Sequence, residues 1–176
     1  MTRKRTLVGS GCSHFVTFST FGRRKLLSTS AARRIVMDEL NRLAEADRVR
    51  VTGFVIMPDH VHALLWFGDD RDLAEVMNVW KAASARRLRK WYEATYPGMI
   101  EFLLVARSGR ERVSFWQRRY YDLNLWDNDK VRQKIDYMHY NPVKGGLCAS
   151  QADWLWSSWR WYNLREEVGV RMNPGF

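Results

Sequence analysis

Cysteine is scarce in this sequence, and the two present exclude folds that depend on sulfur. Cys12 and Cys148 stand far apart and match no metal-binding spacing. Two cysteines are also too few for the framework of disulfide bonds that small secreted domains use. We therefore expect free thiols and a cytoplasmic location.

Long apolar runs are missing as well. No stretch approaches the ~20 apolar residues that a membrane-spanning helix needs, so we expect no membrane partner. The basic amino terminus, residues 1–5, is not followed by the apolar run of a signal peptide. Internal repeats, low-complexity segments and linkers are also missing, and 176 residues suit one domain. The sequence predicts a single domain over residues 1–176.

Acidic side chains are outnumbered by basic ones. The chain has 19 Asp and Glu against 29 Lys and Arg, a formal net charge of +10, and residues 81–120 hold ten basic residues against three glutamates. Clustered positive charge attracts polyanions. Nine Trp, seven Tyr and eight Phe supply rings that can stack on unpaired bases. The pattern indicates a single-stranded nucleic acid partner; the alternative is a basic surface that serves solubility, with the aromatic residues in the core.

The spacing of apolar residues predicts alternating strands and helices. We expect strands over residues 14–20, 48–57, 60–67 and 114–121, and helices over residues 28–46, 73–92 and from Asp127 or Asn128 to about Tyr140. The last helix should stop there because Pro142 disfavours helical geometry at Asn141. The order strand, helix, strand, strand, helix, strand predicts an α+β fold, a ferredoxin-like antiparallel sheet with helices on one face.

Two segments lie outside this plan. Residues 94–113 contain a Pro-Gly break, a short apolar run and a charged Ser-Gly turn, so we expect an insertion or a lid near this segment. Residues 154–161 hold four tryptophans, and this tail is expected to pack back on the sheet.

Histidine is also rare, with four in the chain, yet two of them form the sequence His60-Val61-His62. On a strand, residues two apart project from the same face. Two imidazoles can thus hold one divalent metal ion, including Mg²⁺ or Mn²⁺ when oxygen ligands complete the shell. The pair predicts a metal site, although two such histidines also occur without a metal.

A tyrosine stands apart on the last predicted helix. The apolar stripe of that helix consists of Val131, Ile135 and Met138. At ~100° per residue, Tyr137 falls outside this stripe, and Asn141 follows it by one turn. Lys130 and Lys134 share its side. This arrangement suits a site that handles phosphate; the alternative is that Tyr137 packs against a neighbouring element.

Several motifs together resemble a known family. Residues 57–62 (MPDHVH), 115–122 (FWQRRYYD), 136–147 (DYMHYNPVKGGL) and 153–162 (DWLWSSWRWY) resemble the REP-associated tyrosine transposases. These are a branch of the single-tyrosine HUH transposases related to the IS200-like insertion sequences. The resemblance spans about residues 14–162 and implies the HUH endonuclease fold.

The resemblance implies a chemistry. His60 and His62 match the family's metal-binding pair, and Asn141 matches its third ligand, where many relatives have Gln. Tyr137 matches the nucleophile, which would form a 5′-phosphotyrosine with a divalent metal, Mg²⁺ or Mn²⁺, as cofactor. The implied partner is single-stranded or hairpin DNA, and the location is cytoplasmic and nucleoid-associated. The protein would be a monomer or a homodimer, with Tyr137 acting in cis or in trans.

Basic residues near these motifs are the expected contacts to DNA phosphates. They are Arg23, Arg24, Lys25, Lys81, Arg86, Arg118, Arg119, Lys130, Lys134 and Lys144. Three other functions remain open: a replication-initiator or relaxase-like nickase, a metal-dependent hydrolytic nuclease, and a non-catalytic module that binds single-stranded DNA or RNA. The transposase-like enzyme is favoured because it alone uses all the motifs at once. The recognised DNA sequence, and whether the protein moves DNA in its cell, do not follow from the residues.

Overall fold

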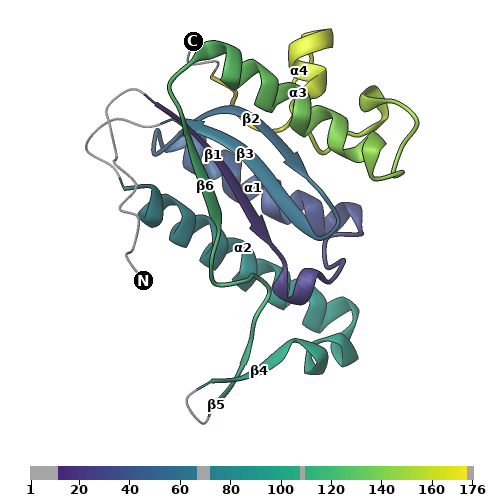
Figure 1. Ribbon diagram of the computed structural model, residues 1–176. Coiled ribbons are helices and arrows are strands. Elements are labelled where there is room, and N and C mark those ends of the chain that lie inside the picture. Colours follow the sequence, from purple (N-terminus) through teal and green to yellow (C-terminus); the bar gives the residue numbers. More distant parts are fainter. Residues whose placement is uncertain (1–11, 67–71, 108–109, 174–176) are drawn as a thin grey trace.

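A four-stranded antiparallel sheet forms the centre of the molecule (Figure 1). The computed structural model describes residues 12–66, 72–107 and 110–173. The strands are β1 (Ser13–Ser19), β2 (Arg50–Ile56), β3 (His60–Trp66) and β6 (Tyr121–Leu125), in the spatial order β2-β3-β1-β6. β1 pairs antiparallel with β3 and β6, and β2 pairs antiparallel with β3. The predicted antiparallel α+β fold is confirmed.

Two helices cover one face of this sheet. α1 (Ser30–Glu45) begins at the cap residue Thr29, and α2 (Leu73–Thr95) begins at Asp72; each cap side chain accepts a hydrogen bond from a backbone N–H of the first turn. Apolar side chains at helical spacing, such as Val36 and Leu40, are fully buried between the helices and the sheet. Trp80 donates a hydrogen bond from Nε1 to the Val36 carbonyl at 3.0 Å, which ties α2 to α1. These are the helices predicted for one face.

The third long helix, α3 (Asn128–Lys144), lies on the opposite face (Figure 1). Its buried stripe is the predicted one, and it packs on Phe15 and Leu64 of the sheet. Gly53 in β2 permits this approach, because a Cβ there would lie 2.9 Å from Met138 Cε and 3.6 Å from Ile135 Cγ1. The expectation of helices on one face therefore holds for α1 and α2, while α3 adds a layer on the other side.

The predicted strand over residues 114–121 is wrong, since the fourth strand is β6, which begins where that prediction ends. Phe115 and Trp116 are buried in the same cluster, under α1 and α2, whereas consecutive strand residues would point to opposite faces of the sheet. Trp116 donates from Nε1 to Ser84 Oγ of α2 at 3.1 Å, and a single bridge joins it to Thr20. Packing under α2 therefore outweighs sheet pairing in this segment.

The predicted end of α3 near Tyr140 is also wrong, because the helix runs through Pro142 to Lys144. Proline lacks an N–H group, so Pro142 removes one backbone hydrogen bond from the helix. Because Pro142 lies close to the helix end, only the final turns lose this bond. The backbone N–H groups of Gly145 and Leu147 donate to the carbonyls of Asn141 and Pro142 at 2.8 and 2.9 Å. These bonds close the helix beyond the proline.

Residues 94–113 form an attachment that projects from the body (Figure 1). It consists of two 3-10 turns, η2 (Pro97–Met99) and η3 (Glu101–Leu103), and a hairpin of β4 (Leu104–Arg107) and β5 (Arg110–Val113). The hairpin is a separate two-stranded sheet. Leu103 is fully buried and anchors the attachment to the main core. Its role as a lid stays a prediction.

The tryptophan-rich tail packs along the edge strand β2, as predicted. It contains η4 (Gln151–Asp153) and α4 (Trp159–Leu164). The Ile56 N–H donates to the Trp156 carbonyl at 2.8 Å, and the Ser158 N–H donates to the Phe54 carbonyl at 3.0 Å. In the part of the chain that the structure describes, none of the helices has the length and apolar content to span a membrane.

Candidate active site

His60 and His62 lie side by side on β3, on the face that α3 covers. The pairing of β3 with β1 sets Ser19 opposite His60 and Thr17 opposite His62. The centroids of the two imidazole rings are 4.7 Å apart. Val61 between them is fully buried in the core under α1 and α2. The geometry of the pair is as predicted; its role in binding metal stays a prediction.

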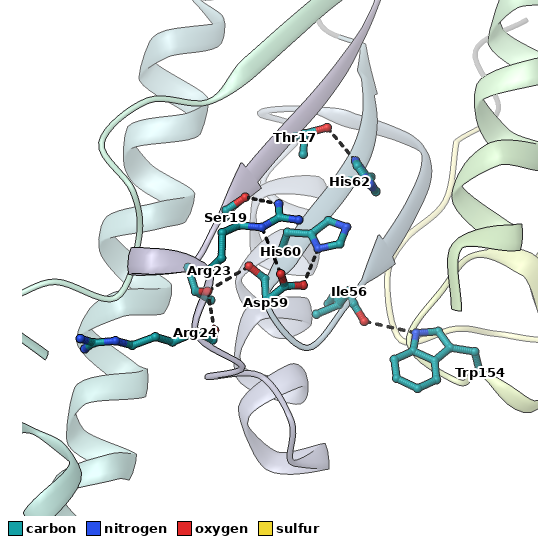
Figure 2. A network of polar contacts seen from close by, with 10 residues as sticks. Thr17, Ser19, Arg23, Arg24, Ile56, Asp59, His60, His62 and Trp154 are labelled. Atoms are coloured by element: carbon teal, nitrogen blue, oxygen red, sulfur yellow. Dashed lines mark hydrogen bonds and ion pairs between the residues drawn. The ribbon is translucent and has the colours of Figure 1, made fainter. Parts of the chain in front are cut away.

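Each imidazole is held through the same ring atom (Figure 2). His60 Nδ1 lies 2.6 Å from Asp59 Oδ1, and His62 Nδ1 lies 2.6 Å from Thr17 Oγ1. A histidine that ligates a metal usually binds an oxygen through its other nitrogen, which fixes the ring and its tautomer. The arrangement therefore leaves both Nε2 atoms for a shared ligand.

The electrostatics keep His62 neutral. Burial is the largest of the causes that lower the pKa of His62 to about 3, followed by coulombic repulsion from His60, Arg23 and Lys134. A neutral imidazole is the form that binds a metal ion, because protonation would occupy the nitrogen lone pair. At neutral pH, His62 is thus in the state that a metal site requires.

α3 brings Tyr137 against this pair. The ring centroids of Tyr137 and His62 are 5.6 Å apart, and the Tyr137 ring also meets Phe15 edge-on at 6.2 Å. Lys134 lies one turn earlier, with Nζ 5.3 Å from the Tyr137 ring centroid and 4.8 Å from that of Phe15. Tyr137 is 44% exposed, so its ring borders the site without being enclosed. The structure therefore brings His60, His62, Tyr137 and Lys134 of the predicted site together.

Asn141, the predicted third ligand, is bonded within its own helix. Its Nδ2 donates to the Tyr137 carbonyl at 3.1 Å. Among the described residues, no three His, Cys, Asp or Glu side chains are grouped so that they could hold a metal ion. The two anchored imidazoles fit a divalent ion, with amide or water oxygens left to complete its shell.

A charged network joins His60 to Asp59 and Arg23, and the sequence motifs assign Asp59 no role in the site. Asp59 Oδ2 lies 3.1 Å from Arg23 Nε, and Arg23 Nη1 donates to Ser19 Oγ at 3.0 Å (Figure 2). Arg23 ends the short turn η1 (Phe21–Arg23) that follows β1. An aspartate directly before a His-x-His pair is a signal that could have identified part of this network.

Two other basic residues point elsewhere. Arg24 extends away from the histidines in Figure 2 and donates from Nη1 to the Phe102 carbonyl. Lys81 donates from Nζ to the carbonyls of Gln117 and Arg118 at 2.8 and 3.0 Å. Burial lowers the pKa of Lys81. In this structure the charge of Lys81 is used to hold the loop after β5, and its contact with DNA stays a prediction.

The remaining expected DNA contacts lie on the surface. The exposed ones are Lys25, Arg86, Arg118, Arg119, Lys130 and Lys144. A groove of about 740 Å³ separates η1 from α2 and residues 113–118, and Phe21, Lys81 and Arg118 are among the residues that line it. Basic side chains thus lie on more than one side of the molecule, and their roles stay predictions.

Comparisons with known proteins bear on the family and the fold of this chain. A Haemophilus influenzae protein described as a REP-associated tyrosine transposase is 26% identical to this chain over 103 residues. The matched residues are 58% of this chain and 54% of that protein, so the match spans about half of the relative's length. A solved REP-associated tyrosine transposase, described as bound to a REP hairpin, superimposes with a TM-score of 0.70 at 17% identity and covers 99% of this chain and 93% of its own. That likeness shows the fold. The family model for IS200-like transposases matches residues 10–141, three quarters of the sequence, and the chain therefore belongs to the IS200-like transposase family.

Proposed function

We propose that this protein is a metal-dependent endonuclease and strand transferase for single-stranded DNA, with Tyr137 as its nucleophile. The observation that carries the proposal is the position of Tyr137, whose ring lies 5.6 Å from His62 and remains 44% exposed. A tyrosine that served only packing on α3 would be buried with Ile135 and Met138. Membership of the IS200-like family supports the same reading.

In the proposed reaction, the Tyr137 oxygen attacks the scissile phosphorus. A new bond forms between phosphorus and the tyrosine oxygen, and the bond to the 3′-oxygen breaks. The products are a 5′-phosphotyrosine and a free 3′-hydroxyl. Because one phosphodiester replaces another, the 3′-hydroxyl can attack in reverse and reseal or transfer the strand without ATP.

The residues around Tyr137 have separate tasks. A divalent ion, Mg²⁺ or Mn²⁺, held by His60 and His62 with Asn141 as a third ligand, would polarise the phosphate and offset its charge. Lys134, with Nζ 5.3 Å from the Tyr137 ring centroid, would stabilise the negative charge on the attacking oxygen. Thr17 and Asp59 would keep the imidazoles in place.

The proposed substrate is a DNA hairpin with a single-stranded flank. The solved relative with the same fold is described as bound to a REP hairpin. The net charge of +10 and the exposed basic side chains support a polyanionic partner here. We propose further that Tyr137 acts in cis, because it meets His62 of its own chain.

The test is a covalent adduct with a labelled hairpin. Wild-type protein with Mg²⁺ or Mn²⁺ should give a protein–DNA species that survives denaturation, retains label on the strand 3′ of the break and releases label from the other side. Tyr137→Phe should fold and bind DNA but form no adduct, whereas Tyr140→Phe, on the same helix and 53% exposed, should form it normally. Cleavage by Tyr137→Phe would instead show that water is the nucleophile. Binding by the wild type without cleavage in any metal would favour a non-catalytic module.

A further inference from the structure

Arg23 is fixed beside the histidine pair from two directions. Its Nε lies 3.1 Å from Asp59 Oδ2, and its Nη1 donates to Ser19 Oγ at 3.0 Å. The same Asp59 holds His60 Nδ1 at 2.6 Å through its other oxygen. One carboxylate therefore sets the positions of both the Arg23 guanidinium and the His60 imidazole. Figure 2 shows the two side chains converging on it.

The backbone that carries Arg23 is strained. Gly22 and Arg23 have φ angles of +63° and +55°, in the left-handed region that residues other than glycine adopt at a cost. The Thr20 side chain and backbone hold the turn to the Asp59 carbonyl, with distances of 2.9 Å from both Oγ1 and N. Strain that its surroundings maintain in this way is often found at functional sites.

The guanidinium still has capacity to bind a ligand. It carries five N–H groups in a planar fork, and Ser19 and Asp59 occupy the Nη1 and Nε positions. Among the residues that the structure describes, Nη2 meets no acceptor. The Arg23 side chain is 57% exposed, so a ligand at the histidine pair can reach it from solvent. A guanidinium held beside the reacting group can bind a phosphate through two parallel N–H groups.

We propose that Arg23 is a catalytic residue that binds the scissile phosphate through its Nη atoms and stabilises the charge that develops there during attack. The inference rests on the proposed function, because it places the reacting phosphate between Arg23, the histidine pair and Tyr137. It assigns Arg23 to the scissile phosphate itself, apart from the attacking oxygen that Lys134 would stabilise. Arg24, its neighbour, is bonded to the distant Phe102 carbonyl.

The test neutralises one DNA phosphate at a time. In the Tyr137→Phe background, with a chelator present, we would measure affinity for a hairpin with a single-stranded flank, taken from inverted repeats beside the coding region. Each flank phosphate is replaced in turn by a neutral methylphosphonate. In protein that keeps Arg23, methylphosphonate at one flank position should weaken binding about tenfold, because the charge-assisted bond from Arg23 to that phosphate is lost. In Arg23→Gln, which cannot make this bond, the same replacement should weaken binding by less than about twofold.

Arg48 provides the matched control. It is an exposed arginine, paired with Glu75 at 3.5 Å, and lies just before β2, whose first residue pairs with Trp66 at the end of β3 far from His60. Arg48→Gln removes the same charge and should leave the sensitive position unchanged. Arg23→Lys, which keeps the charge without the fork, should restore part of the sensitivity and provides a second variant if Arg23→Gln does not fold.

The sensitive phosphate should be the one that wild-type protein cleaves, and Arg23→Gln with Tyr137 intact should form adduct about 100-fold more slowly. The assignment of Arg23 would be overturned if no flank phosphate depended on Arg23 for binding. It would also be overturned if the phosphate that depends on Arg23 were not the one at the cleaved bond. A wild-type protein that forms no adduct would instead overturn the proposed function. The two failures are therefore distinguishable.

Discussion

At the scale of single residues, the orientation of the histidines depends on partners that are not in the His-x-His sequence. Thr17 comes from β1, and Asp59 comes from the turn before β3; both bind an Nδ1 atom at 2.6 Å. The shared face of the two histidines and the position of Tyr137 outside the apolar stripe are evident in the sequence because their spacing is local, while their roles stay predictions. Thr17 could not be predicted, since its position opposite His62 depends on strand register across 45 residues.

The contact between Asp59 and His60 leads to a prediction about metal affinity. Asp59→Ala removes the group that orients His60, so Mn²⁺ should bind about 10- to 100-fold more weakly, as measured by calorimetry. The control is Asp129→Ala, which removes an 80% exposed carboxylate at the start of α3 and should leave the affinity for Mn²⁺ unchanged. Equal Mn²⁺ affinity in Asp59→Ala and wild type would show that the ion is held elsewhere.

The buried histidine His139, which lies outside the candidate site, leads us to predict a loss of stability in acid. Burial lowers its pKa from 6.5 to about 4, and its Nε2 lies 2.8 Å from Ser158 Oγ. The folded pKa is depressed, so its full contribution to stability is present above pH 6.5 and is lost as the pH falls toward 4. Between about pH 7.5 and about pH 5, this one group should lower the free energy of unfolding by about 2 kcal/mol.

The measurement is denaturant unfolding of wild type and His139→Gln at both pH values. Glutamine does not titrate, so the variant should lose about 2 kcal/mol less than wild type over that interval. His62 remains in both proteins, and its contribution cancels in the comparison. An identical pH dependence in the two proteins would contradict the assignment.

At the scale of elements, α3 is the part of the fold that positions Tyr137. Its apolar stripe is evident in the sequence, because Val131, Ile135 and Met138 recur at helical spacing. The prediction that it ends near Tyr140 is wrong, since the cost of Pro142 is small so close to the terminus and the bonds from Gly145 and Leu147 offset it.

The misplaced fourth strand has a different cause. Phe115 and Trp116 have strand-like propensity, but burial under α2 determines their conformation, and that tertiary contact is not visible in a local pattern. The positions of β1, β2 and β3 agree with the prediction within two residues, because alternation or continuous apolar character marks these strands directly.

The close contact between β2 and α3 can be tested at Gly53. Gly53→Ala would place a methyl group 2.9 Å from Met138 Cε, the end of a flexible but fully buried side chain, so Met138 has to repack between β2 and α3. We expect a destabilisation of about 1 kcal/mol and slower adduct formation, because Tyr137 precedes Met138 on the same helix. Combining the change with Met138→Leu, which removes Cε, should recover part of the loss.

Gly98→Ala is the matched control, since a Cβ at this position meets nothing within 4 Å. Thermal unfolding and adduct rates are the measurements. Full activity and stability in Gly53→Ala would mean that α3 does not depend on this contact for its position.

At the scale of the whole molecule, the excess of positive charge predicts binding that depends strongly on salt. Each phosphate contact to a single strand contributes a slope of about −0.7 to the plot of log affinity against log salt. Replacing Arg118 and Arg119, both exposed, with Gln should flatten this slope by about 1.4 if each contacts one phosphate. A titration by fluorescence anisotropy at several salt concentrations measures it. An affinity independent of salt would show that the basic surface does not bind DNA phosphates.

The central claim is that the Tyr137 oxygen becomes joined to DNA. The most direct measurement is mass spectrometry of the adduct after digestion with protease and nuclease, which identifies the modified residue and the attached nucleotide. We predict a peptide that carries a nucleotide through its 5′-phosphate on Tyr137, and on no other residue. A nucleotide on Tyr140, or cleaved DNA with every tyrosine unmodified, would contradict the account.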